Sequence, residues 1–155
     1  MSVRRRRAHP AVVLRVPSRT EFLAAIRDTT QRVAEIAGLD AGTAAQVALA
    51  VDEAATNVIE HAYAGADDRF VELDFECPPG ELVVEIVDDG RRVDRRSLPR
   101  VDLRRYALER RRGGFGVHLM SRIMDRVSFR RRGRCNVCCM VKKLKPAQAQ
   151  AQEVH

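Results

Sequence analysis

Apolar residues recur with two different periods along the 155 residues of this chain, and the change of period marks out its elements. Apolar positions three or four residues apart indicate helices, and strict alternation with polar positions indicates strands. The predicted elements are, in chain order, a strand at 11–16, helices at about 19–37 and 43–63, strands at 70–77 and 82–87, a helix that opens at 113–116, and strands at 127–131 and 135–141. Two β-hairpins are expected, one from the strands at 70–77 and 82–87 and one from the strands at 127–131 and 135–141.

The second predicted helix is long and rich in alanine, and its apolar positions form one stripe: Val47, Val51, Ala54, Ala55, Val58 and Ala62. Both long helices begin with a pattern typical of a capping box, in which two side chains satisfy backbone donors at the helix start. One box pairs Ser18 with Glu21. The other pairs Thr43 with Gln46, and Asp40 competes with Thr43 as the cap.

Helices and strands grouped in this order predict an α+β fold, a two-layer sandwich with helices on one face of a mainly antiparallel sheet. We divide the chain into a basic leader at 1–10, predicted to be disordered, a single domain at 11–145 and a low-complexity tail at 146–155. Residues 91–112 lack strong periodicity and are rich in arginine. They are expected to form a long loop, and loops of this length in compact domains tend to be functional or disordered.

Charge is divided unevenly along the chain. Residues 1–90 hold 9 Arg and 16 acidic residues, whereas residues 91–155 hold 19 Lys or Arg and 5 acidic residues, and the chain carries a net charge of +7. A basic segment can bind nucleic acid or an acidic protein. However, its arginines are not interleaved with the aromatic residues that stack on single strands. A solvated surface explains the charge more simply, so nucleic acid is not the expected partner.

No apolar run approaches the ~20 residues that a membrane helix needs, so no membrane contact is expected. The basic start of the chain is not followed by a long apolar segment, so no secretory signal is predicted. The four cysteines then point to a reducing compartment, and a cytoplasmic location is expected. Alternation along a strand places Cys138 opposite Cys135 and Cys139, which favours packing in the core over a zinc site.

The polar side of the second helix carries a carboxylate, a carboxamide and an imidazole. Glu53, Asn57 and Glu60 are spaced i, i+4 and i+7, so in a regular helix they point within about 60° of one another, and His61 lies on the same side. Such a face can hold a hard cation through oxygen and keep a proton acceptor beside it. Alternatively, it is the face that an amphipathic helix exposes to water.

Two further clusters stand at element ends. Asp88-Asp89-Gly90 ends a buried strand, where an aspartate can accept a hydrogen bond from an exocyclic amine, although Asp-Gly is also common in simple turns. Gly113-Gly114-Phe115-Gly116 opens a helix, and free backbone N–H groups at a helix start attract phosphate. Three arginines precede this glycine-rich entrance: Arg110, Arg111 and Arg112.

In this order and spacing, the three clusters resemble the N, G1 and G2 boxes of the GHKL ATP-binding superfamily. The segment DEAATNVIEHAY at 52–63 is most similar to the anti-sigma-factor serine/threonine kinases, and the resemblance covers about residues 11–144. It implies the histidine-kinase-like ATP-binding fold, with a mixed, mainly antiparallel sheet. It also implies ATP and Mg²⁺ as cofactors and an ATP-dependent serine/threonine protein kinase activity.

Position by position, the resemblance implies that Glu53 is the general base and that Asn57 binds Mg²⁺. Asp88 would accept a hydrogen bond from the adenine amino group, and Gly90 would let the ring approach the backbone. Residues 91–112 would form a lid over the nucleotide. The full set implied to bind the cofactor is Asn57, His61, Asp88, Gly90, Arg112, Gly114, Phe115 and Gly116.

The resemblance further implies a small anti-sigma-factor antagonist as the phosphoacceptor, a sigma factor as the competing partner, and a homodimer. The chain departs from the family pattern at Arg92, where the G1 box usually has a second glycine, and this implies a stiffer hinge. That departure motivates an alternative, a non-catalytic nucleotide-sensing module that sequesters a regulatory partner. His118 replaces an apolar or aromatic residue, and we interpret it as a tolerated substitution.

Overall fold

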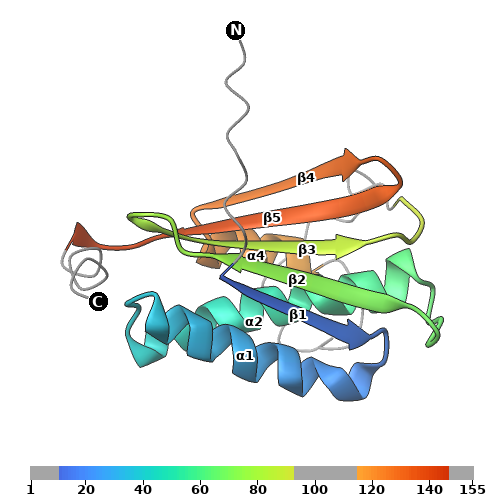
Figure 1. Cartoon of the computed structure of the whole chain (residues 1–155), viewed down its shortest axis with the longest axis horizontal. Helices are drawn as coiled ribbons and strands as arrows, with labels where there is room; N and C mark the ends of the chain where they lie inside the picture. The colour runs from blue at the N-terminus through green and yellow to red at the C-terminus, as the bar shows by residue number, and fades with distance from the viewer. Residues whose placement is uncertain (1–10, 93–114, 147–155) are drawn as a thin grey trace, which may run out of the picture.

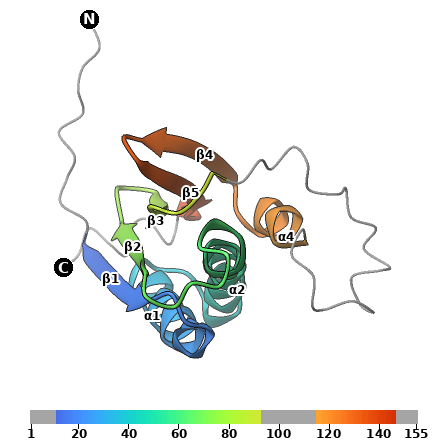
Figure 2. The same ribbon diagram turned by 90° about the vertical axis from the view of Figure 1, so that its right-hand side faces the viewer.

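The computed structural model describes residues 11–92 and 115–146, which form two layers (Figure 1). Figure 2 shows the layers edge on, with one five-stranded sheet on one side and the helices packed against a single face of it. The α+β sandwich predicted from the order of elements is therefore confirmed. The predicted leader at 1–10, the loop at 93–112 and the tail at 147–155 lie outside the described residues.

The sheet has the order β1-β2-β3-β5-β4, and all four pairings are antiparallel. Its strands are β1 (Val12–Pro17), β2 (Phe70–Glu76), β3 (Glu81–Asp88), β4 (Arg126–Arg132) and β5 (Cys135–Lys143). Both predicted hairpins are confirmed, and they meet where β3 pairs with β5. The register of that pair sets Asp88 directly opposite Asn136. This places an acid and an amide side by side at the end of β3.

The helical layer consists of a 3₁₀ turn η1 (Thr20–Phe22), α1 (Leu23–Ile36), α2 (Ala41–Asn57), a π-helical segment η2 (Val58–Ala62) and α4 (Phe115–Ile123). The predicted apolar stripe of the second helix is buried along its full length. It packs against core-facing side chains of the sheet such as Leu73, Phe75 and Ile86, which are fully buried.

Both predicted capping boxes are wrong. Asp40 caps α2 instead, because its Oδ1 accepts from the Thr43 amide at 2.9 Å and its Oδ2 from the Thr43 hydroxyl at 2.8 Å. Ser18 caps nothing. Its buried hydroxyl donates to the Ala66 carbonyl at 2.6 Å and accepts from the Arg69 amide at 3.2 Å. Ser18 thus ties the end of β1 to the start of β2, and the tertiary contact outweighs the local one.

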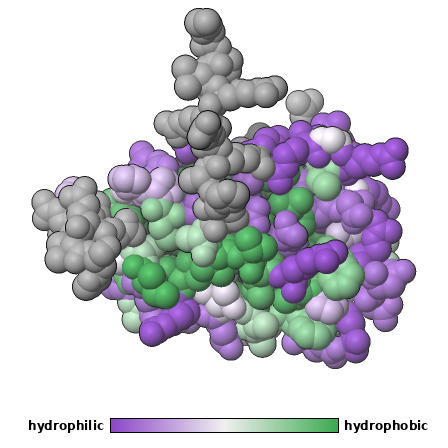
Figure 3. All heavy atoms as spheres, in the orientation of Figure 1, coloured by the Kyte–Doolittle hydropathy of each residue, from purple (hydrophilic) through white to green (hydrophobic). Residues whose placement is uncertain are grey.

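The sheet face turned away from the helices is visible in Figure 3, where apolar side chains lie near the start of β1 and hydrophilic ones along β4. Val13 and Phe70 are exposed there by 54% and 45%. Among the described residues none of the four cysteines forms a disulfide; Cys138 is buried in the core, and Cys135 and Cys139 are half-buried on the other side of β5. No helix within 11–92 and 115–146 is long and apolar enough to cross a membrane.

Candidate nucleotide site

Glu53 and Asn57 stand one turn apart on α2, half-buried on the side of the helix that does not pack against the sheet. Neither side chain forms a hydrogen bond or ion pair with another residue of the described segments. Asp52, next along the helix, is held differently, because its carboxylate pairs with Arg27 on α1 at 3.1 Å. Glu53 therefore carries a negative charge that α1 does not neutralise.

Burial raises the pKa of the Glu53 carboxyl, and the negative charges of Asp52 and Glu60 raise it further. Both effects act in the same direction, since each makes the ionised form less favourable in the folded protein. A carboxyl whose pKa is shifted toward neutrality is a better general base than an ordinary exposed glutamate. Carboxyls with shifted pKa values also occur often at functional sites.

The same shift predicts how stability depends on pH. Because the pKa of Glu53 is higher in the folded than in the unfolded chain, the folded state binds more protons between the two values, and stability falls as pH rises through that window. We expect Glu53→Gln to raise the free energy of unfolding at pH 7 and to flatten its pH dependence in the range just above the ordinary pKa of a glutamate. Urea unfolding curves collected across that range measure both effects. A variant less stable than the wild type at pH 7 would contradict this account.

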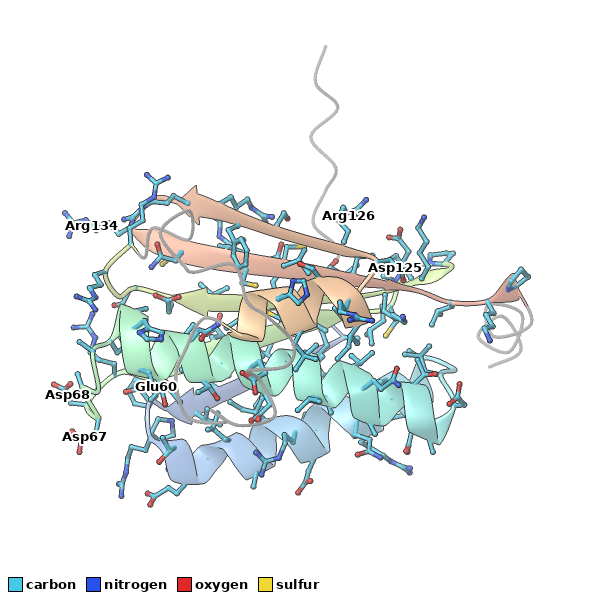
Figure 4. All side chains as sticks on the ribbon, turned by 180° about the vertical axis from the view of Figure 1, so that it is seen from behind. Glu60, Asp67, Asp68, Asp125, Arg126 and Arg134 are labelled. Atoms are coloured by element: carbon cyan, nitrogen blue, oxygen red, sulfur yellow. The ribbon has the colours of Figure 1, made fainter. Side chains whose placement is uncertain are left out.

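The helix changes character after Asn57, because residues 58–62 form a π-helical turn. The regular spacing that predicts a common face for Glu53, Asn57 and Glu60 therefore does not extend to Glu60 and His61. Glu60 is exposed near the end of the helix, on the same end of the molecule as Asp67 and Asp68 (Figure 4). π-Helical turns occur frequently at functional sites, where they redirect side chains.

His61 shows the consequence of this turn. The residue as a whole is half-buried, but its Nε2 atom is buried and has no hydrogen-bond partner among the described residues. Buried polar atoms nearly always have a partner, and one without needs an explanation. A ligand group that exchanges a hydrogen bond with Nε2 would supply one.

The second part of the site is the corner at the end of β3. Asp88 is only 5% exposed, and its Oδ1 accepts from the Gly90 amide at 3.0 Å and from the Asn136 side chain at 2.8 Å. The Asn136 amide also donates to the carbonyls of Gly90 at 3.1 Å and Arg91 at 3.3 Å. Asn136 thus fixes both the carboxylate and the backbone that follows it.

Gly90 lies against the end of the helix. A Cβ atom at this position would stand 2.4 Å from the Ala62 carbonyl oxygen and 2.7 Å from its carbonyl carbon. These are backbone atoms and cannot move aside as a flexible side chain can. The corner of β3 therefore requires glycine for its packing on η2, independently of any ring that approaches it.

The helix end and the corner are joined by three further residues. The Arg91 amide donates to Ala62 O at 2.9 Å, and its Nε donates to His61 O at 2.7 Å. The Tyr63 hydroxyl contacts the Phe70 carbonyl at 2.5 Å and Asp89 Oδ1 at 3.0 Å, and accepts from the Asp89 amide at 3.2 Å. Asp89 also pairs with Arg69 at 3.0 Å.

Sequence reasoning missed these contacts. Asn136 did leave a signal, because it occupies a core-facing position of a strand whose neighbours on that face, Cys138 and Met140, are buried and apolar or weakly polar. Tyr63 and Arg91 left none, since their partners, the Asp89 carboxylate and several backbone atoms, are brought to them only by the fold. Arg112 and Gly114 lie outside the described residues. Phe115 begins α4 with Gly116 next to it, and His118 is exposed on that helix.

The donors present fit a magnesium nucleotide. The Asn57 carboxamide oxygen, at the end of α2, is a hard ligand of the kind that Mg²⁺ prefers. Among residues 11–92 and 115–146, no cluster of three or more His, Cys, Asp or Glu could hold a metal ion alone. Mg²⁺ keeps several waters and is commonly bound through one or two protein ligands together with substrate phosphates.

Comparison with protein families assigns the class. Residues 16–142 match the family model described as the histidine kinase-like ATPase domain, so the chain belongs to that family. Among solved structures it is similar to the RsbU and RsbW domains of a Mycobacterium tuberculosis protein, with a TM-score of 0.57, 14% identity and coverage of 88% of this chain and 34% of that one. A histidine kinase domain from Erythrobacter litoralis gives a TM-score of 0.53 at 19% identity, over 90% and 66% of the two chains.

Curated relatives narrow the resemblance to one kind of regulator. The serine-protein kinase RsbW of Halalkalibacterium halodurans is 28% identical over 123 residues, which cover 77% of this chain and 75% of the relative. The serine-protein kinase RsbW of Bacillus pumilus is 30% identical over 123 residues, which cover 75% of this chain and 75% of the relative. The anti-sigma F factor of Clostridium botulinum is 33% identical over 81 residues, 51% of this chain and 55% of the relative. The predicted family of anti-sigma-factor kinases is thereby confirmed.

Proposed function

We propose that this protein is an ATP-dependent serine/threonine protein kinase that acts as an anti-sigma factor. It would phosphorylate a small antagonist protein and sequester a sigma factor, with ATP and Mg²⁺ as cofactors and a homodimer as the working form. The names of the RsbW and anti-sigma F relatives support the class of activity. Such a switch depends on exclusive binding, because the unphosphorylated antagonist displaces the sigma factor and phosphorylation ends that displacement.

The observation that carries the proposal is that a candidate metal ligand and a buried hydrogen-bond acceptor lie near the same end of one helix. Oxygen donors of α2, above all Asn57, lie on one side, and the buried Asp88 carboxylate at the end of β3 lies on the other. The corner after Asp88 packs directly on η2, the continuation of α2. One nucleotide can therefore reach both, with phosphates toward the helix and the adenine ring toward the sheet.

When bound, magnesium ATP supplies the phosphoryl group, and each residue of the candidate site would have a separate role. Asn57 would hold the metal through its side-chain oxygen. Asp88, fixed by Asn136, would accept from the adenine amino group, and His61 Nε2 would exchange a hydrogen bond with the nucleotide. Glu53 would orient the acceptor hydroxyl and take its proton. Phosphoryl transfer requires little beyond such positioning and neutralisation of charge.

One observation favours the alternative of a binding module that senses nucleotide without catalysis. Arg92 occupies the position of the second glycine in the family pattern, and the residue before it, Arg91, forms two hydrogen bonds to the end of the helix. A backbone fixed in this way has less freedom to rearrange than one with glycine. The alternative retains nucleotide binding and partner capture but not phosphoryl transfer.

Calorimetry with Asn57→Ala tests the proposal. We expect the wild-type protein to bind ATP in millimolar magnesium. The variant is expected to bind it about tenfold to a hundredfold more weakly, because a contact to a charged centre contributes about 1.5–3 kcal/mol. Gln46→Ala, an exposed change on the same helix, serves as the matched control and leaves affinity unchanged. Failure of the wild type to take up any adenine nucleotide would refute both the kinase and the sensing module.

A pull-down from native extract, with and without ATP and followed by phosphosite mapping, then separates kinase from sensing module. A kinase releases an antagonist phosphorylated on serine or threonine when ATP is added. A sensing module captures its partner without modifying it, and Asn57→Ala would still capture that partner.

A further inference from the structure

The corner that carries Asp88 is attached to the helix that carries Asn57 by contacts that belong to neither residue. The last carbonyls of a helix lack partners within it, and here two of them are satisfied from outside. Ala62 O accepts from the Arg91 amide at 2.9 Å, and His61 O accepts from Arg91 Nε at 2.7 Å. A basic side chain at this end is also favoured by the helix dipole. Arg91 thus caps the helix from the next layer of the fold.

Tyr63 makes the second attachment. Its hydroxyl accepts from the Asp89 amide at 3.2 Å and faces two acceptors, the Phe70 carbonyl at 2.5 Å and Asp89 Oδ1 at 3.0 Å. The Arg69 guanidinium stands 5.5 Å above the Tyr63 ring centre and pairs with Asp89. One phenol at the helix end therefore holds both the backbone and the side chain of the residue between Asp88 and Gly90.

The protonation states of this network are constant near neutral pH. Burial raises the pKa of Tyr63 to about 12, so the phenol keeps its proton. The hydrogen bond from Arg69 is the main reason that the pKa of Asp89 lies below its ordinary value, so that carboxyl stays ionised. The attachment is therefore not a pH switch.

On the sheet side, Asn136 holds the same corner through Asp88, Gly90 and Arg91. The corner is thus fixed from two directions, to the sheet by Asn136 and to the helix by Tyr63 and Arg91. Removal of the helix contacts would leave Asp88 bound to the sheet. Without the helix contacts, however, the distance between Asp88 and the oxygen ligands of α2 would no longer be fixed.

From this arrangement we propose that Tyr63 and Arg91 are positioning residues of the nucleotide site, which set the separation of the adenine-side carboxylate from the metal-side amide. The inference rests on the proposed function, because it concerns the same nucleotide. Neither residue needs to touch the ligand. Their contribution is the fixed geometry that lets one molecule engage Asp88 and Asn57 at the same time, so that ordering the site is not required on binding.

The test uses Tyr63→Phe, which removes only the hydroxyl, and Arg91→Met, which removes the Nε donor but keeps the backbone amide. Affinity for magnesium ATP is expected to fall about tenfold in each variant, because the free energy of about one hydrogen bond that orders the site is lost. Affinity for adenosine, which needs only the Asp88 side, is expected to stay within about twofold by NMR titration. Arg91→Lys is expected to recover most of the ATP affinity. Arg32→Met, an exposed arginine on α1, is the matched control.

The outcomes separate this inference from the proposed function. Equal affinity of wild type, Tyr63→Phe and Arg91→Met for magnesium ATP overturns the positioning role and leaves the nucleotide site standing. A parallel loss of ATP and adenosine binding also overturns it, because it indicates general damage to the fold. No uptake of adenine nucleotide by the wild type overturns both proposals.

Discussion

Phosphoryl transfer to the antagonist is expected to fall about 10²- to 10⁴-fold in Glu53→Ala, the range typical of a lost general base. The carboxyl is half-buried, and neither α1 nor the sheet neutralises it among the described residues. Its pKa is raised by burial and by Asp52 and Glu60, which brings its basicity closer to that needed near neutral pH. Affinity for magnesium ATP is expected to stay within about twofold or to rise, because no role in holding the nucleotide is assigned to Glu53.

Radiolabel transfer from ATP to the purified antagonist measures the rate, and calorimetry measures the affinity of the same variant. Glu35→Gln, a carboxyl on α1 that pairs with Arg32, is the control for loss of one negative charge and should transfer phosphate at the wild-type rate. Transfer at that rate in Glu53→Ala would refute the role of general base. A loss of ATP binding in the same variant would reassign Glu53 to the metal.

The comparison of Glu53→Ala with Glu53→Gln links function and stability at one position. Glutamine removes the ionisable group but keeps most of the volume, so the proton acceptor disappears while the cost of burying a charge is relieved. A variant that is more stable at pH 7 and inactive would show that the fold tolerates this carboxyl for its chemistry. Such exchanges of stability for activity are common at functional sites.

The spacing of apolar residues predicted the two layers of this fold because it indicates both the type of each element and the side of it that is buried. The alternation of Leu73 and Phe75 with acidic neighbours leaves only one face of β2 able to join a core. The stripe on α2 is equally unambiguous. These elements are where local preference and tertiary packing agree, and each of them is found where the pattern indicates.

Local patterns failed where a tertiary partner offered a better contact. Ser18 matches a capping box, but its hydroxyl is buried against Ala66 and Arg69 from the chain 48 and 51 residues away. At α2, Asp40 accepts two hydrogen bonds from Thr43, so an ionised carboxylate displaces the hydroxyl cap. Only the cap of α2 could have been anticipated from the sequence, in which Asp40 competes with Thr43 as the capping residue.

The candidate site divides in the same way. Glu53, Asn57 and Asp88 were accessible to sequence reasoning because a motif and a polar helix face mark them. The π-helical turn, which redirects Glu60 and His61, has no signature in the residue pattern. Asn136 became a partner of Asp88 only through the register of β3 and β5, a pairing that spans 48 residues. The residues that hold the site together are thus less predictable than those expected to touch the ligand.

Gly90→Ala is expected to lower the free energy of unfolding by about 1–3 kcal/mol, the usual cost of forcing an atom into a packed region. The new Cβ would meet the Ala62 carbonyl oxygen at 2.4 Å, so the corner must move off η2. That movement breaks the bond from the Arg91 amide to Ala62 O and displaces Asp88, and magnesium ATP affinity is expected to fall at least about tenfold.

The decisive measurement is urea unfolding of Gly90→Ala without nucleotide, because it separates two reasons for glycine at this corner. If glycine serves only the approach of the adenine ring, the free protein keeps wild-type stability and only the affinity for nucleotide falls. If packing on Ala62 requires it, both fall together, and this is the result we expect. Gly42→Ala is the matched control, since its Cβ meets one side-chain atom, Asp40 Oδ1 at 3.3 Å, instead of backbone atoms, and alanine favours the helix.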